Sequence, residues 1–350
     1  MTSHPTLAER FRAFEPAFTA GPAPLYAHLA RSAADELDRP APSPFRDVLL
    51  PWAEEPPRRF LPLRLLAVVH RWVLSNELPD LRPFYRSAGG GRRPHGAWPL
   101  FRAAVIERAD ELPELLAPPL QHNEPGRAGA LAVGMVEIAR ETGMPLRLLE
   151  VGTSAGLLLR WDRYRRTWWF AGLFEDGTPP PDLVQIGERR GCDLFPIDPL
   201  TQDNEILLKS FVWADLAAHV WMVDDAVEVC RRIPAIIERA DGAEWLEQEL
   251  AEPRAGVATV VFHSLMRASG PPASLDRIAE TLSRAGARAR PDAPLAYLRF
   301  EAPSNLAITP GQARGLVETR LTLWPGGRDR LLATSDVNGR HVCRVESEPT

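Results

Sequence analysis

The chain has 350 residues, of which 45% are hydrophobic and 25% charged, and this composition is typical of globular proteins rather than disordered ones. Its formal net charge of -5 argues against a general nucleic-acid or membrane-surface binder. The N-terminus lacks a signal-peptide pattern, and no apolar run approaches the roughly 20 residues that span a bilayer, so we expect a cytoplasmic protein.

The first 140 residues are predicted to be helical. Residues 6–18 place Leu7, Phe11, Phe14 and Phe18 at three- and four-residue spacing, which predicts one face of a helix. Residues 60–78 are apolar on most sides, as in a buried helix, and helical patterns return at 98–117 and 125–142. The sequence therefore predicts a helical region or lid over 1–140.

From residue 146 onward, short apolar runs alternate with helical patterns such as the one at 274–287. The expected strands lie within 146–151, 182–193, 234–241, 256–264 and 294–302. Strands separated by helices imply parallel pairing, because a parallel return requires a crossover. A Pro-Gly-Gly turn within 320–336 predicts a closing antiparallel hairpin. We expect an α/β fold with a Rossmann-like, mostly parallel sheet over 141–350.

The stretch EVGTSAG, residues 150–156, follows the first expected strand. Gly152 would let the chain turn, and Gly156 would let a helix start close to the strand or to a ligand. The free N–H groups of that helix would suit an electron-rich ligand group. Ligands of open parallel sheets bind beyond the carboxyl ends of the strands, where the strand order reverses. The alternative is a turn that needs glycines for its shape alone.

Acidic residues follow the next two expected strands. Asp193, at the end of the second strand, is the candidate to accept hydrogen bonds from a ribose, with Glu188 as the competing choice. Asp241 follows the third strand and could contact the ligand as well. Asp193 could instead be a loop or cap residue, and Asp241 an ordinary helix cap.

The fourth strand ends in His263 and Ser264. A histidine at this position could take a proton from an acceptor hydroxyl or amine at neutral pH, or it could be a structural histidine bonded to the backbone. Glu301, at the end of the fifth strand, could face the same cleft. The three cysteines form no CxxC pair, so we predict no metal site.

One stretch of the helical region, QHNEPGRAGAL at 121–131, carries several polar side chains. Asn123, Glu124 and Arg127 could line the cleft and bind the substrate, with Arg127 holding a carboxylate or phosphate. The structural alternative is that Asn123 caps the helix that follows, with Glu124 and Pro125 in its first turn.

The order of glycine turn, acidic strand end, acidic turn and closing hairpin resembles class I S-adenosylmethionine-dependent methyltransferases. The resemblance implies that S-adenosylmethionine lies over Gly152 and Gly156, with Ser154 at the position of the family's middle glycine. It also implies that Glu150 lies near the amino end of the methionine moiety, Asp193 at the ribose and Asp241 at the adenine.

The whole chain also resembles a bacterial family, the domain of unknown function 2332. Segments spread over roughly 120–327 carry the likeness: QHNEPGRAGAL, LLEVGTSAGLLLRWDRY, ERRGCDLFPIDP, LLKSFVWADL, GVATVVFHS, APLAYLRFE and LTLWPGG. This resemblance implies a methyltransferase-like core and brings no established activity.

We therefore expect a methyltransferase that acts on an unidentified small molecule, with His263 as the candidate base. The alternative is a non-catalytic ligand-binding or scaffold protein with the same fold. A nicotinamide oxidoreductase is disfavoured by the hairpin and by the incomplete G-x-G-x-x-G motif. The sequence gives neither the methyl acceptor nor the oligomeric state.

Overall fold

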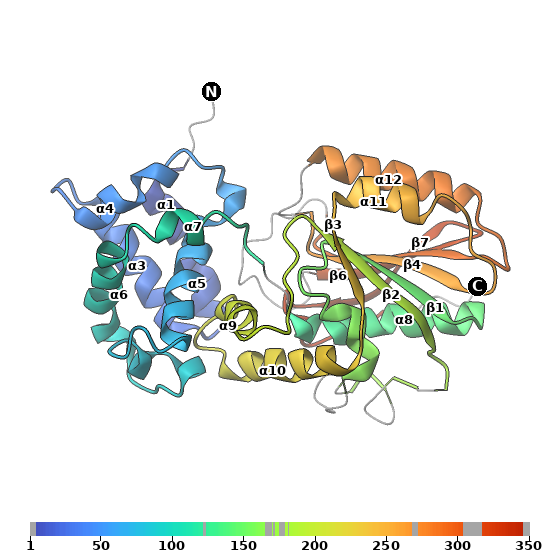
Figure 1. Cartoon of the computed structure of the whole chain (residues 1–350), viewed down its shortest axis with the longest axis horizontal. Helices are drawn as coiled ribbons and strands as arrows, with labels where there is room; N and C mark the ends of the chain where they lie inside the picture. The colour runs from blue at the N-terminus through green and yellow to red at the C-terminus, as the bar shows by residue number, and fades with distance from the viewer. Residues whose placement is uncertain are drawn as a thin grey trace. The chain divides into compact units, whose positions relative to one another are not determined.

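The computed structural model describes residues 5–121, 124–164, 170, 172–174, 179–180, 182–267, 272–303 and 317–345. The described residues form two compact units (Figure 1). The helical unit contains residues up to 121 together with Thr201–Asp224, and the sheet unit contains the other described residues. This division differs from the expected boundary at residue 140, because 124–140 belongs to the sheet unit and 201–224 to the helical unit.

The helical unit is built from short and medium helices. They are α1 (Leu7–Arg12), α2 (Glu15–Ala20), α3 (Pro24–Asp38), α4 (Pro44–Leu49), α5 (Leu61–Leu74), α6 (Ala97–Glu107), α7 (Leu112–Leu115), α9 (Gln202–Ser210) and the start of α10 (Ala217–Arg232). The 3-10 segments are η1 (Leu50–Trp52), η2 (Pro57–Arg59), η3 (Arg82–Phe84), η4 (Arg86–Ala88) and η5 (Pro94–Gly96).

The single helix expected over 6–18 is two helices, α1 and α2. Thr6 and Glu9 form a capping box at the start of α1. Pro16 lies in the first turn of α2, where a missing N–H costs nothing. The apolar residues of the predicted face, including Phe11 and Phe18, are nevertheless all buried, so the periodicity identified the core correctly.

The sheet unit contains one eight-stranded sheet. Its strands are β1 (Leu146–Val151), β2 (Ile186–Asp193), β3 (Ile236–Arg239), β4 (Ala258–Ser264), β5 (Leu295–Glu301), β6 (Val317–Trp324), β7 (Arg328–Ser335) and β8 (Cys343–Arg344). Their order is β3-β2-β1-β4-β5-β6-β7-β8, with β1 to β5 parallel and β6 to β8 antiparallel. The five expected parallel strands and the hairpin are confirmed, and the strand order reverses between β1 and β4.

Helices cover both faces of this sheet (Figure 1). On one face, α8 (Ala128–Thr142) packs so closely on β5 that a Cβ added at Gly134 would lie 2.2 Å from Leu298 Cδ1. On the other face, α11 (Gly242–Glu249) and α12 (Pro272–Ala287) form a core with Leu149 and Val261. None of the described helices is long and apolar enough to cross a bilayer.

Candidate functional site

The loop after β1 has three residues with left-handed backbone, Gly152 (φ +70°), Ser154 (φ +52°) and Gly156 (φ +67°). At Gly152 an added Cβ would meet only Met266 at ordinary contact distance, so the backbone conformation is what favours glycine there. At Gly156 an added Cβ would lie 2.7 Å from Ile237 Cδ1. Gly156 therefore serves the close approach of this loop to β3.

The expected helix after this loop is absent from the described residues. The chain instead forms a six-residue 3-10 segment, η7 (Leu158–Arg163), and Arg160 within it has non-helical angles. Side chains take the carbonyls that an α-helix would use, because Arg160 Nη1 donates to Gly156 O at 2.7 Å and Tyr164 Oη donates to Leu157 O at 2.6 Å. The α-helix expected to start near Gly156 is therefore wrong for the described residues, and ligand binding by this loop stays a prediction.

Ser154 is joined to the end of β2. Its N–H donates to Asp193 Oδ2 at 2.8 Å, and Asp193 Oδ1 accepts from Phe195 N at 2.8 Å. Ser154 Oγ is buried and has no hydrogen-bond partner among the described residues. Asp193 thus lies beside the glycine loop, whereas Glu188 contacts Arg147 and Arg254 toward the other end of β2.

Asp241 follows β3 and caps α11. Its Oδ1 accepts from the N–H groups of Ala243 and Glu244, and its Oδ2 accepts from Ser274 Oγ at 3.0 Å. Because β1, β2 and β3 are adjacent and parallel, Glu150, Asp193 and Asp241 all lie toward the same edge of the sheet. The structure therefore places the three acids that the sequence selected at the same end of the sheet, with Asp193 close enough to Glu150 to raise the pKa of its carboxyl.

Glu150 is a buried acid near the end of β1. Its Oε2 accepts a hydrogen bond from Thr153 Oγ1 at 2.6 Å. Burial raises the pKa of Glu150 to about 8, with Asp193 contributing and with Thr153, Arg160 and Arg127 opposing. The carboxyl is thus mostly protonated at neutral pH, and it can donate a proton as well as accept a hydrogen bond.

His263 and Ser264 lie on opposite faces of the sheet, as neighbours on a strand must. His263 Nε2 is 2.7 Å from the hydroxyl of Tyr297, on the α11 and α12 face. His263 Nδ1 lies 2.9 Å from Glu301 Oε1, without the alignment of a hydrogen bond. Glu301, His263 and Tyr297 therefore form a row along β4 and β5, with Glu301 at the carboxyl end of β5 and Tyr297 nearer its start.

Tyr297 is the residue that sequence reasoning missed. The available signal was the parallel pairing of β4 with β5, which places residues 297, 299 and 301 on the same face as His263. Burial raises the pKa of Tyr297 to about 12, with Arg299 and Arg267 opposing and Glu301 and Asp329 contributing, so its hydroxyl stays protonated at neutral pH.

Arg127 lies on the α8 face, just before α8. Its Nη1 donates to Ser264 Oγ at 3.0 Å and its Nε to Val337 O at 3.1 Å. Burial lowers its pKa to about 10, while four carboxylates, those of Glu124, Glu301, Glu150 and Asp336, oppose this shift. The Arg127 guanidinium thus carries a positive charge close to several buried acids near the carboxyl ends of the strands.

Glu124 is the N-cap of the 3-10 turn η6 (Pro125–Arg127), since its Oε1 accepts from Gly126 N at 3.0 Å. The cap was expected from Asn123, which lies outside the described residues. Substrate roles for Asn123, Glu124 and Arg127 stay predictions.

The fold and this site define an α/β protein with a Rossmann-like strand order and a polar cluster where that order reverses. A family model described as "Uncharacterized protein conserved in bacteria (DUF2332)" matches residues 8–344, and the chain belongs to this family. Comparisons with curated proteins and with solved structures gave no match.

Proposed function

We propose that this protein is an S-adenosylmethionine-dependent methyltransferase that acts on a small molecule. The observation that carries the proposal is the position of Glu150, Asp193 and Asp241 at the ends of three adjacent parallel strands, around the loop of Gly152 and Gly156. This edge adjoins the point between β1 and β4 where open α/β sheets bind nucleotides.

The residues present fit such a cofactor in two respects. Ser154 Oγ is a buried oxygen without a partner in the described part of the chain, so a ligand hydroxyl or amine can satisfy it. Each oxygen of Asp193 accepts one backbone N–H and keeps a lone pair for a ribose hydroxyl. Glu150 would hold the amino group, and the bound cofactor would supply an electrophilic methyl group on a sulfonium.

The row of Glu301, His263 and Tyr297 would handle the acceptor's proton. Because Glu301 ends β5, an acceptor at this end of the sheet would pass its proton to His263 by way of the Glu301 carboxylate, while the Tyr297 hydroxyl, 2.7 Å from Nε2, would hold the imidazole in place. Glu301 near Nδ1 would stabilise the imidazolium that results. Orientation of the acceptor would supply most of the rate enhancement.

A second candidate, a non-catalytic ligand-binding or scaffold protein with the same fold, is favoured by the bonding of the loop itself. The N–H groups of Gly152 and Thr153 both donate to Cys192 O, and those of Ser154 and Gly156 donate to Asp193 Oδ2 and Thr153 O. These four donors hold the turn and are not directed at a ligand.

Calorimetry of the purified protein with S-adenosylmethionine tests the proposal. We expect Asp193→Asn to weaken binding about tenfold or more, since it loses a charged acceptor worth about 1.5–3 kcal/mol. The matched control is Glu188→Gln, in the same strand but toward its other end, which should leave affinity unchanged. Binding should also release a proton below about pH 8, because an ammonium group beside Glu150 lowers the pKa of that carboxyl.

Absence of binding heat would refute the methyltransferase. Binding without any methylated product, judged by mass spectrometry after incubation with a metabolite mixture, would leave the second candidate.

A further inference from the structure

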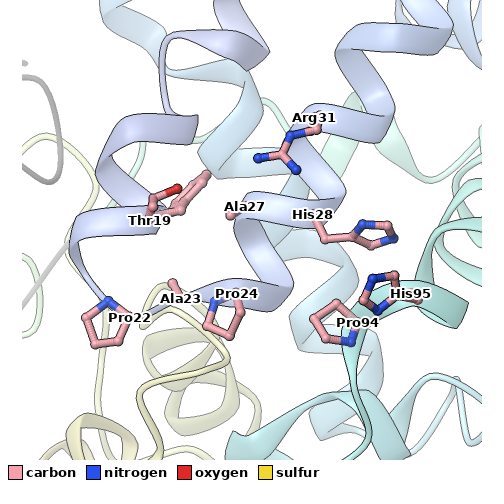
Figure 2. Close-up of a pocket in the computed structure, with 10 residues that line it drawn as sticks. Thr19, Pro22, Ala23, Pro24, Ala27, His28, Arg31, Pro94 and His95 are labelled. Carbon is pink, nitrogen blue, oxygen red and sulfur yellow. The ribbon is translucent and has the colours of Figure 1, made fainter.

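The helical unit contains a cavity that none of the candidate site residues lines. Its volume is about 420 Å³, within the range of small-molecule pockets. It lies among α2, the start of α3 and η5 (Figure 2). The lining residues are Phe18, Thr19, Pro22, Ala23, Pro24, Ala27, His28, Arg31, Pro94 and His95.

The cavity has an apolar side and a nitrogen-rich side. Phe18, Ala23 and Ala27 are buried and supply apolar contact surface. His28 and His95 lie next to each other, with ring centroids 5.8 Å apart (Figure 2). His28 Nε2 is buried and has no hydrogen-bond partner among the described residues. Leaving such a group unsatisfied is unfavourable, so a ligand that bonds to it gains binding free energy.

The ionisable groups that line the cavity are all basic. Arg31 lines it beside His28, one turn further along α3, and the Arg31 guanidinium is held by the carboxylate of Glu15. Burial lowers the pKa of His28, and the charges of His95 and Arg31 lower it further. Glu15 is not among the lining residues, so no acid within the cavity opposes these charges. An anion between the two rings would reverse this unfavourable arrangement.

We propose that this cavity binds a small organic carboxylate. The carboxylate would accept hydrogen bonds from the imidazoles of His28 and His95, and the apolar body would pack on Phe18, Ala23 and Ala27. A metal ion fits less well, because two imidazoles are too few ligands for a structural site and Arg31 repels a cation. The proposal is independent of the methyltransferase, since every lining residue belongs to the helical unit.

Titration of the full-length protein with benzoate, followed by NMR of the histidine side chains, tests this site. We expect shifts of the His28 and His95 resonances, and a pKa of His28 that rises when benzoate binds. Affinity should fall as pH rises, because the carboxylate favours the protonated imidazole of His28, which loses its charge when His28 is deprotonated.

Two substitutions test the binding site without removing the packing of the helical unit. His28→Phe keeps a ring of similar shape and removes the donor, and Thr19→Trp, at an exposed position of the rim, fills the entrance. Each should weaken benzoate binding about tenfold or more. The control is Arg12→Gln, which removes a basic side chain that pairs with Asp35 and Asp38 of α3 outside the cavity, and it should bind as the parent does.

Equal binding of benzyl alcohol and benzoate would overturn the proposal in favour of a purely apolar cavity. Shifts of both histidines with Zn²⁺ but not with benzoate would overturn it in favour of a metal site. Unchanged histidine resonances at about 10 mM benzoate, where even a weak millimolar site is occupied, would show that no such site exists.

Discussion

Burial of one side chain, that of Glu150, sets the protonation state of its carboxyl at this end of the sheet. Glu150 carries its proton at neutral pH because its carboxyl is removed from water, although Arg127 and Arg160 lie close enough to oppose this. Ionising a buried carboxyl costs free energy, and a charged ligand that binds beside it readily changes its protonation state. This is the behaviour expected of a binding group rather than of a structural ion pair.

Glu150→Gln should make the protein more stable than the parent at higher pH. The folded-state pKa of Glu150 is about 8 and its ordinary value is 4.5, so the folded state holds a proton that the unfolded state loses. Stability from this group is therefore full below about pH 4.5 and falls as pH rises to about 8, by roughly 4 kcal/mol.

Urea unfolding of parent and variant at about pH 5 and pH 8 measures this difference. The difference in unfolding free energy between variant and parent should be larger at pH 8 than at pH 5. An equal difference at both pH values would mean that Glu150 is ionised in the folded protein.

At the scale of elements, the sequence predicted strands better than helices. The run ATVVF is apolar without alternation, which fits a strand covered on both faces, and both this run and LRLLEV became central strands of the sheet. The helix expected after Gly156 failed because Arg160 and Tyr164 take its carbonyls, a contact that helical periodicity cannot reveal. Likewise, Tyr297 meets His263 only through the pairing of β4 and β5.

Gly134→Ala in α8 tests how tightly this helix lies on the sheet. Alanine normally stabilises a helix interior by about 1 kcal/mol over glycine, but the new methyl group would meet Leu298 at 2.2 Å. We expect a net loss of about 1–3 kcal/mol from overpacking.

A double-mutant cycle supplies the control. In a Leu298→Ala background the methyl group has room, so Gly134→Ala should cost little or stabilise the protein in urea unfolding. An equal loss in both backgrounds would place the cause elsewhere than in this contact.

At the scale of the molecule, the helical unit is assembled from two distant chain segments. Trp213 packs edge-on against Phe18, with ring centroids 4.9 Å apart. Asp215 accepts the N–H groups of Leu25 and Tyr26, at the start of α3, where the N-cap position itself offers no side-chain hydrogen bond. Hydrophobic patterning predicted the buried face at 6–18 and the buried helix within 60–78, but it could not assign a segment 80 residues further along to the same core.

A fragment of residues 1–121 should therefore lack a cooperative urea transition. Removing the buried Trp213 side chain alone should lower the free energy of unfolding by about 3–5 kcal/mol. This is a large part of the roughly 5–15 kcal/mol that stabilises a typical domain. A fragment that joins 1–121 to 201–224 through a flexible linker should regain the transition and the near-ultraviolet circular dichroism of packed aromatic rings. A cooperative transition in the shorter fragment would contradict the two-segment core.

The return of Thr201–Asp224 to the helical unit has a consequence for synthesis of the protein. When the ribosome has translated residue 121, the ring of Phe18 still lacks its contact with Trp213. About 100 further residues, or about 5–20 s at usual elongation rates, must follow before Asp224 is made. During that interval the nascent helices expose apolar surface, so newly made chains depend on chaperones until translation has passed the second segment.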